Sequence, residues 1–332
     1  MSDTLLNVNQ LKTYFYTASG VVHAVDGVSF QLEKGKTMGI VGESGSGKSV
    51  TANSIIRLLP PAGKIVDGSI TFDGKDMMAL TQRELQQMRG SDIAMIFQDP
   101  MTSLDPVFRV GDQMVEMLME HNKTLSRKQA WDISLKALEE VGIPSPEKRM
   151  RAYPHELSGG MCQRVIIAMA VCCEPKLLIA DEPTTALDVT VQAQVLDLMA
   201  ELQKNHDTAI LLVTHNLGVI WKMADSVMVM YAGNTVEYAD TKTLYEKPMH
   251  PYTWGLLDSM PTLSGNGDKD LNTIPGTPPD LRLTGTCCNF YNRCKYATSQ
   301  CEESVPPLTE IEPGHFVACH KQCPGNHLER KG

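Results

Sequence analysis

Long apolar runs are missing from this chain of 332 residues. None of its apolar stretches reaches the roughly 18 residues that a membrane-spanning helix needs. The first residues, MSDTLLNVNQ, also lack the basic segment and the apolar segment of a secretion signal. These absences exclude a membrane-spanning chain and predict a soluble, cytoplasmic one.

Positive charge is scarce as well. The chain has 30 Lys and Arg residues but 39 Asp and Glu residues, which gives a formal net charge of -9. Binding along DNA or RNA depends on clustered Lys and Arg, so no nucleic-acid partner is expected. Any nucleotide should be a bound small ligand. Hydrophobic residues make up 42% of the chain, and the length allows one large α/β unit plus an appendage.

The first sixty residues predict strands followed by one helix. Residues 6–34 alternate apolar and polar side chains, which predicts antiparallel strands with turns at Gly20 and Gly27. Residues 37–41 form a short apolar strand. Residues 49–59 follow a glycine-rich turn and predict a helix that ends at a pair of prolines.

The rest of the chain predicts helices between apolar strands. Residues 104–141 have helical spacing, and the alternation of helices with the later strands predicts a parallel sheet core. Near residue 240 the pattern weakens and Pro, Gly and Cys become frequent, so we predict a main domain of residues 1–240 and an extension of residues 241–332. The later strands are expected at 177–181, 209–215 and 226–233.

The glycine-rich turn carries a phosphate-binding motif. Its sequence GESGSGKS matches the full G-x-x-x-x-G-K-[ST] pattern between a predicted strand and a predicted helix. Glycines let backbone N–H groups converge on phosphate oxygens, and Lys48 should bridge the β- and γ-phosphates while Ser49 binds Mg²⁺. The residues expected to bind the nucleotide are Gly42, Glu43, Ser44, Gly45, Ser46, Gly47, Lys48, Ser49 and Val50.

Two carboxylates end the apolar strand at 177–181. If this strand lies beside the phosphate-binding loop, Asp181 comes near Mg²⁺ and Glu182 faces the γ-phosphate. A carboxylate beside the attacking water can orient it and accept its proton, so Glu182 is the expected catalytic base. His215 ends another apolar strand, from which its imidazole could reach a γ-phosphate oxygen.

The segment LSGGMCQR at residues 157–164 resembles the signature sequence of ABC ATPases. This resemblance implies ATP and Mg²⁺ as cofactors and the ABC-ATPase fold of the P-loop NTPases. The fold has a RecA-like parallel sheet core, an antiparallel β subdomain and a helical subdomain, here at about residues 100–165, and a cysteine-rich C-terminal extension follows it. Met161 stands where many members of the family have Gln.

The same resemblance implies roles for single residues. Gln98 looks like the Q-loop glutamine, which touches Mg²⁺ and contacts the membrane subunit. Asp188 in the segment ALD looks like the D-loop aspartate, and His215 looks like the switch histidine. The motifs that hydrolyse ATP are all intact, which predicts an active ATPase.

Two further implications concern the nucleotide. An aromatic residue near the start of the chain stacks on adenine in this family, and by spacing the candidates are Phe15 first, then Tyr14 and Tyr16. The signature residues of one subunit complete the ATP site of another, which implies a head-to-tail dimer of two copies or of two related chains. The residues expected to reach across are Ser158, Gly159 and Gly160.

Four longer segments, MIFQDPMTSLDPVF, YPHELSGGM, DEPTTALDVTVQAQ and HPYTWGLL, resemble the peptide-transporter branch of ABC importers. The resemblance implies an ATP-hydrolysing subunit on the inner face of the cell membrane that powers import of peptides. Its partners would be a second ATPase subunit, two membrane permease subunits and, indirectly, a substrate-binding protein. Import of nickel, glutathione or another small solute is the alternative.

Cysteines gather near the end of the chain, where five of the nine lie between residues 287 and 319. The segment CNFYNRCKYATSQC resembles a tail motif that holds a 4Fe-4S cluster in some members of the branch. Four thiolates suit an Fe–S cluster or Zn²⁺, although the C-x-x-C pairs common in zinc sites are missing. Zinc and unligated cysteines stay open as alternatives. The expected ligands are Cys288, Cys294, Cys301 and Cys319.

Two other classes of protein fit parts of this pattern. A soluble ABC ATPase of DNA repair or translation would carry a long coiled-coil insertion or two cassettes, and this sequence has neither. A noncatalytic Fe–S module with a vestigial nucleotide fold would have lost Lys48, Glu182 or His215, which are all present.

Overall fold

The computed structural model describes residues 3–185, 187–260, 273–325 and 327–330. Contacts divide the chain into two compact units, which we call the first unit and the second unit. The first unit comprises Met1–Asp3, Glu33–Lys36 and Ala79–Leu212, and the second comprises Thr4–Leu32, Thr37–Met78 and Val213–Gly332. No helix in the described ranges is both long enough and apolar enough to cross a membrane.

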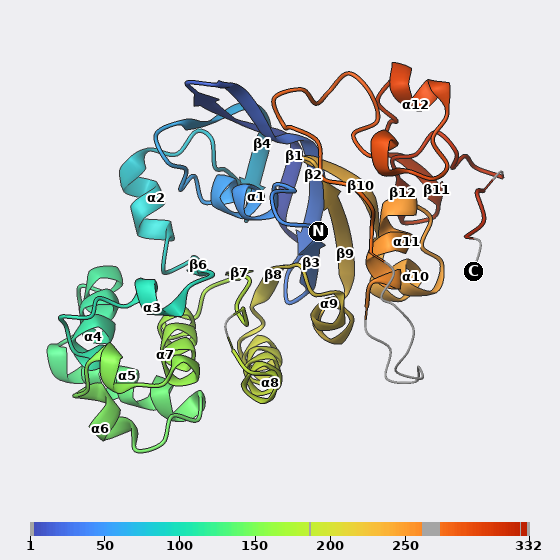
Figure 1. The fold of residues 1–332 in the computed structure, drawn as a ribbon. Helices are drawn as coiled ribbons and strands as arrows, with labels where there is room; N and C mark the ends of the chain where they lie inside the picture. The colour runs from blue at the N-terminus through green and yellow to red at the C-terminus, as the bar shows by residue number, and fades with distance from the viewer. Residues whose placement is uncertain (1–2, 186, 261–272, 326, 331–332) are drawn as a thin grey trace. The chain divides into compact units, whose positions relative to one another are not determined.

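The second unit contains a four-stranded antiparallel sheet with the order β2-β1-β4-β5 (Figure 1). Its strands follow the alternating apolar pattern of the sequence, so that one face is buried and the other is wetter. The strands are β1 (Thr4–Thr17), β2 (Gly20–Glu33), β4 (Gly63–Phe72) and β5 (Lys75–Asp76).

The turn predicted at Gly20 is confirmed, because β2 begins there. The turn predicted at Gly27 is wrong. Gly27 lies inside β2 with a φ of +80°, so its left-handed backbone distorts the strand without ending it.

A second sheet of this unit contains strands from both ends of the chain. Here the order is β11-β12-β10-β9-β3, with β3 parallel to β9 and the other neighbours antiparallel. The C-terminal extension therefore adds two strands to the edge of the ATPase sheet. The strands are β3 (Thr37–Val41), β9 (Ser226–Tyr231), β10 (Asn234–Asp240), β11 (Thr309–Glu312) and β12 (His315–Val317).

The helices of the second unit are short. The predicted helix at 49–59 begins at Lys48 and ends at Ile55, because Arg57 takes a left-handed φ of 52° before the two prolines are reached. The helices of the second unit are α1 (Lys48–Ile55), α9 (Leu217–Met223), α10 (Thr241–Glu246), α11 (Pro251–Asp258), the 3-10 helix η2 (Tyr291–Arg293) and α12 (Ser299–Glu303).

The first unit holds parallel strands and most of the helices. Strand β6 (Ile93–Ile96) is parallel to β7 (Leu177–Asp181), and the Ala209–Leu212 part of β8 (Ala209–Thr214) follows β7 in the order β8-β7-β6. Both β7 and β8 are buried throughout, as their unbroken apolar runs indicate. The predicted parallel pairing is confirmed.

The predicted helical segment at 104–141 is also confirmed. Figure 1 shows α4, α5, α6 and α7 packed together as one group. Ser126 and Gln129 form a capping box that fixes the start of α5. The helices of the first unit are α2 (Gln82–Met88), α3 (Pro100–Ser103), α4 (Val110–His121), α5 (Arg127–Glu140), α6 (Pro146–Met150), η1 (Pro154–Glu156), α7 (Gly159–Val171) and α8 (Val189–His206).

Candidate functional site

The phosphate-binding loop joins β3 to α1 in the second unit, as its motif predicts. Two of its glycines are required by close packing: a Cβ on Gly42 would lie 2.2 Å from the Met230 carbonyl oxygen, and one on Gly47 would lie 2.3 Å from that of Ala24. Gly45 has a φ of +78° and open space where its Cβ would point. The loop is therefore tight against the sheet on one side and open on the other.

Lys48 is buried and folded back across this loop. Its Nζ donates to the carbonyl oxygens of Gly42, at 2.8 Å, and of Glu43, at 2.9 Å. The Glu43 carbonyl also accepts the N–H of Ser46. Ser49 lies half-buried in the first turn of α1, at the positive end of the helix dipole.

The aromatic candidates of β1 face in different directions. The Thr13 hydroxyl lies 2.8 Å from that of Ser54 on α1, and Phe15, two residues further along the strand, shares the face of Thr13. The ring of Phe15 packs against Gly63 on β4. Of the three aromatics, Phe15 is therefore the one on the face towards α1.

Tyr14 and Tyr16 point from the opposite face of β1. The Tyr14 hydroxyl donates to Asp26 at 3.0 Å, and burial together with this bond raises the pKa of Tyr14 to about 12. Its ring also contacts His23. Tyr16 is half-exposed, with the Lys64 ammonium 5.6 Å from its ring centre.

The first unit holds the two carboxylates and Gln98. Strands β6 and β7 are parallel neighbours, so the residues after their carboxyl ends meet at one edge of the sheet. Gln98 donates through Nε2 to Glu182 Oε2 at 3.1 Å, and the Thr185 hydroxyl donates to the same oxygen at 2.8 Å. Glu182 takes a φ of +48°, and Asp181 before it is buried. The structure thus brings Gln98 and Glu182 together and adds Thr185.

The signature segment forms the start of α7. Ser158 is its N-cap and accepts the Met161 N–H, while Gly159 has open space around it. Asp188 caps α8 in the same way, by accepting two backbone N–H groups. A Cβ on Gly160 would lie 2.8 Å from Val191, so the two helix starts are close together. Ala186 of the predicted D-loop lies outside the described residues.

The predicted residues fall into two groups. The first unit carries Gln98, the signature segment, Asp181, Glu182 and Asp188. The second unit carries Phe15, the phosphate-binding loop and His215, which is exposed directly after β8.

The four predicted cysteine ligands line one small cavity of about 20 Å³ in the extension. Cys287 and Cys323 are not among its lining residues. Burial raises the pKa of Cys288 to about 12 and that of Cys319 to about 11, and the neighbouring thiols add to both shifts. Within the described residues, no three His, Cys, Asp or Glu side chains are arranged to hold a metal ion. The cysteines that line this cavity are Cys288, Cys294, Cys301 and Cys319, and their role as metal ligands stays a prediction.

Comparison with known proteins is consistent over both parts of the chain. The family described as ABC transporter matches residues 25–185, and the family described as oligopeptide/dipeptide transporter, C-terminal region, matches residues 236–301. The oligopeptide transport ATP-binding protein OppD of Bacillus subtilis is 52% identical over 314 residues, which cover 94% of this chain and 87% of OppD. The chain belongs to the ATP-binding subunits of oligopeptide/dipeptide ABC transporters.

Other relatives agree with this assignment. The dipeptide transport ATP-binding protein DppD of Bacillus subtilis is 50% identical to the subunit, with 96% of this chain and 95% of DppD covered. Among solved structures, cbiO1 of Clostridium perfringens, part of the ABC transporter complex cbiONQ, is 28% identical with a TM-score of 0.62, covering 74% of this chain and 92% of cbiO1. The dimeric ABC cassette MJ0796 has a TM-score of 0.65 at 24% identity, and the match covers 71% of this chain and 99% of MJ0796. At this identity the similarity supports only the fold. The predicted family and the predicted fold class are confirmed.

Sequence reasoning missed three residues that contact the site of this subunit. Thr185 lies three residues after Glu182, and this short spacing could have indicated a contact between their side chains. Tyr252 and Arg293 both contact Glu43 of the phosphate-binding loop, from 209 and 250 residues away in the sequence. No local pattern could have found those two contacts.

Proposed function

We propose that this subunit binds and hydrolyses ATP and thereby powers the import of peptides. The observation that carries the ATPase proposal is the bonding of Glu182, whose carboxylate is held by Gln98 and Thr185 at the end of a buried strand. A fixed carboxylate there can orient a water molecule and take its proton. The match of residues 236–301 to the C-terminal region of oligopeptide/dipeptide transporters supports peptide as the solute.

Each motif then has a distinct task. The backbone N–H groups from Ser44 to Val50 bind the phosphates, and Lys48 exchanges its two carbonyl partners for phosphate oxygens. Phe15 stacks on adenine from the face of β1 towards α1, and His215 contacts the γ-phosphate. Mg²⁺, which neutralises phosphate charge, would be held by Ser49, Gln98 and Asp181.

The working unit is proposed to be a head-to-tail pair of ATPase subunits. Ser158 and Gly159 are exposed at the start of α7, so they are available to the nucleotide of a partner. The dimeric cassette MJ0796 is a precedent for such pairing in a protein of the same fold. The pair, of two copies or of two related chains, would sit on the inner face of the cell membrane against two permease subunits that receive peptide from a binding protein.

The four clustered cysteines are proposed to hold a 4Fe-4S cluster. They share one cavity that excludes the two neighbouring cysteines. Thiolates are the ligands that both an Fe–S cluster and Zn²⁺ prefer, so Zn²⁺ is the alternative occupant of these cysteines. A bound cluster supplies positive charge that keeps buried thiolates deprotonated and joins the loops of the extension.

Metal content tests this ligand assignment directly. Anaerobically purified protein should contain about four irons and four sulfides with broad absorption near ~400 nm. Cys294→Ser should lose this absorption, whereas Cys323→Ser, a matched change outside the cavity, should keep it. One zinc or no metal in the unchanged protein would refute the cluster.

Peptide import is tested by complementation. Bacteria that lack their own oligopeptide-transport ATPase subunit should regain uptake of a labelled peptide when they express this chain with its cognate permease and binding proteins. Lys48→Ala should abolish uptake without changing expression, because the phosphates lose their cation. Uptake of nickel or glutathione in place of every tested peptide would identify the alternative solute class.

A further inference from the structure

Glu43, the second residue of the phosphate-binding loop, is held at three points. Its carbonyl oxygen accepts the Lys48 ammonium at 2.9 Å. Its backbone N–H donates to the Tyr252 hydroxyl at 2.8 Å. Its carboxylate receives two hydrogen bonds from Arg293, at 2.6 Å and 3.0 Å. Two of these three contacts come from the C-terminal extension.

The contact with Arg293 is a two-bonded ion pair of the kind that fixes orientation as well as distance. The Arg293 side chain is only 5% exposed, and that of Glu43 is 28% exposed. The guanidinium is itself fixed, since it also donates to the carbonyl oxygens of Ile274 and Pro275. The ion pair with Glu43 raises the pKa of Arg293 further, so the cation persists at any physiological pH.

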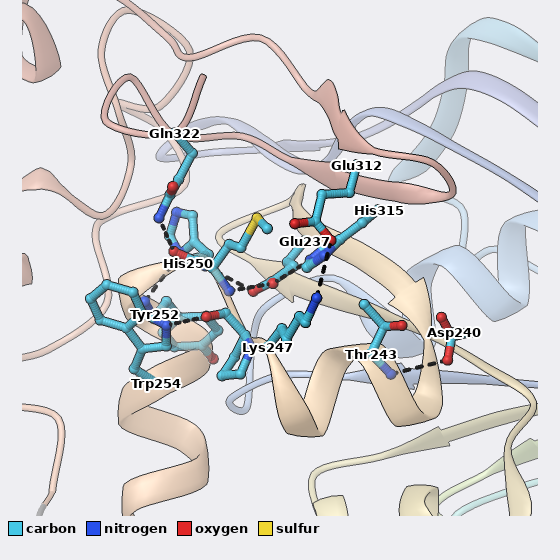
Figure 2. A network of polar contacts seen from close by, with 12 residues as sticks. Glu237, Asp240, Thr243, Lys247, His250, Tyr252, Trp254, Glu312, His315 and Gln322 are labelled. Atoms are coloured by element: carbon cyan, nitrogen blue, oxygen red, sulfur yellow. Dashed lines mark hydrogen bonds and ion pairs between the residues drawn. The ribbon is translucent and has the colours of Figure 1, made fainter. Parts of the chain in front are cut away.

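The extension that supplies Arg293 and Tyr252 is anchored firmly to the ATPase sheet. Figure 2 shows the polar contacts of this attachment. The buried carboxylate of Glu237 on β10 lies 2.8 Å, through Oε1, from Nε2 of His315 on β12. The same carboxylate accepts the backbone N–H groups of Met249 and His250, just before α11. The backbone two residues before Tyr252, at His250, is therefore fixed to β10.

An aromatic cluster connects Tyr252 with the cysteine-lined cavity, because Phe290 belongs to the cluster and lines the cavity. Tyr231, Tyr252 and Phe290 pack ring against ring with centres 4.6–5.5 Å apart. Phe290 precedes η2, which ends at Arg293, and the next residue is Cys294. One short segment thus lies between the cavity of the cysteines and the phosphate-binding loop.

We propose that the C-terminal extension positions the phosphate-binding loop, with Arg293 as a positioning residue that acts through Glu43 on Lys48. This inference rests on the proposed binding of ATP by that loop. Glu43 provides one of the two carbonyl oxygens that hold Lys48, so fixing Glu43 keeps the loop in the shape that receives phosphate. Without Arg293, the loop would become ordered only when the nucleotide binds. The free-energy cost of that ordering would lower the affinity for the nucleotide.

The test compares full-length variants for ATP binding and turnover. Arg293→Gln should raise both the Kd and the KM for MgATP by about tenfold, since a two-bonded charged contact is lost, while kcat stays within about twofold. Arg293→Lys keeps the charge but not the fork and should recover part of the affinity. Arg282→Gln removes an exposed arginine of the same extension and should leave Kd and KM unchanged.

A double-variant cycle separates positioning from general damage. Glu43→Gln should raise the Kd like Arg293→Gln, and the double variant should be no worse than either, because both changes remove one interaction. Unchanged affinity in Arg293→Gln, or additive losses in the double variant, would overturn the proposal. If Arg293→Gln fails to fold, Arg293→Lys with Glu43→Gln completes the cycle. An unchanged protein that does not bind MgATP would instead refute the proposed function.

Discussion

Glu182, the proposed catalytic base, has an unusual backbone conformation. It follows a strand that is buried throughout, yet its φ of +48° turns its side chain to the carboxyl edge of the sheet. Non-glycine residues in this region are uncommon and are often functional. Gln98 and Thr185 both donate hydrogen bonds to one oxygen of its carboxylate, Oε2.

Replacement of Glu182 by Gln should abolish hydrolysis but not binding. The amide cannot accept a proton, so kcat should fall by about 10²-fold or more while the Kd for MgATP changes little. Glu201→Gln, an exposed change on α8, is the control and should keep full turnover. Phosphate release and equilibrium binding measure the two quantities. Undiminished hydrolysis in Glu182→Gln would remove this residue from the mechanism.

Phe15 and Tyr16 provide a matched pair for the adenine contact, because neighbouring residues of a strand point to opposite faces. Phe15→Ala should weaken ATP binding by about tenfold, since stacking of a base on an aromatic ring contributes about 1–3 kcal/mol. Tyr16→Ala should have no effect, because Tyr16 is half-exposed on the other face. Titration with ATP measures both. The opposite ranking would transfer the adenine contact to Tyr16.

At the scale of elements, the attachment of α11 to β10 depends on a buried, neutral histidine. His250 caps α11 by accepting the Tyr252 N–H at Nδ1, and burial lowers the pKa of His250 to about 4. In the unfolded chain its pKa returns to about 6.5. Between these values the unfolded state binds more protons, so stability falls as the pH falls below about 6.5.

This linkage predicts that acid destabilises the unchanged protein more than His250→Asn. Asparagine can also cap a helix but takes up no proton. Between pH 7.5 and pH 5 the difference in unfolding free energy between the two proteins should change by about 2 kcal/mol, with the unchanged protein losing more. Denaturant unfolding at both pH values measures it. His327→Asn, an exposed histidine, should follow the unchanged protein.

Most elements followed from the apolar pattern, and those that did not had specific causes. The strands at 37–41 and 177–181 are buried on both faces, so their apolar runs sufficed. Gly27 was misread as a turn because glycine also permits the left-handed backbone of a distorted strand. Helix α1 ended early because Arg57 turns left-handed, which its side chain does not signal.

At the scale of the whole molecule, the residues proposed to bind MgATP are found in both compact units. The second unit holds Lys48 and Ser49, and the first holds Gln98 and Asp181.

MgATP should slow amide hydrogen exchange in the phosphate-binding loop of the Glu182→Gln protein. Protection is expected at residues 42–50, because the backbone N–H groups of this loop are proposed to bind the phosphates. Mass spectrometry of peptides from the exchanged protein measures this. Lys48→Ala should not show this protection, and unchanged exchange at residues 42–50 in the Glu182→Gln protein would argue against nucleotide binding by this loop.

The sequence by itself determined the family, the fold class and the motifs of this subunit, because each motif is local. A phosphate-binding loop needs its glycines, lysine and serine at fixed spacing, and an apolar strand ending in carboxylates can be recognised from adjacent residues. The sequence also separated four cysteines from their neighbours, through resemblance to a tail motif.

Only the tertiary structure decided which distant residues meet. Whether Phe15 or Tyr16 faces α1 depends on the side of β1 that packs against Ser54, and the link from Arg293 to Glu43 crosses 250 residues. Such contacts arise because strands β9, β10 and β12 bring the extension to the edge of the ATPase sheet. Periodicity along the chain records which side chains are buried, but the partner of a buried charge is set by folding in three dimensions.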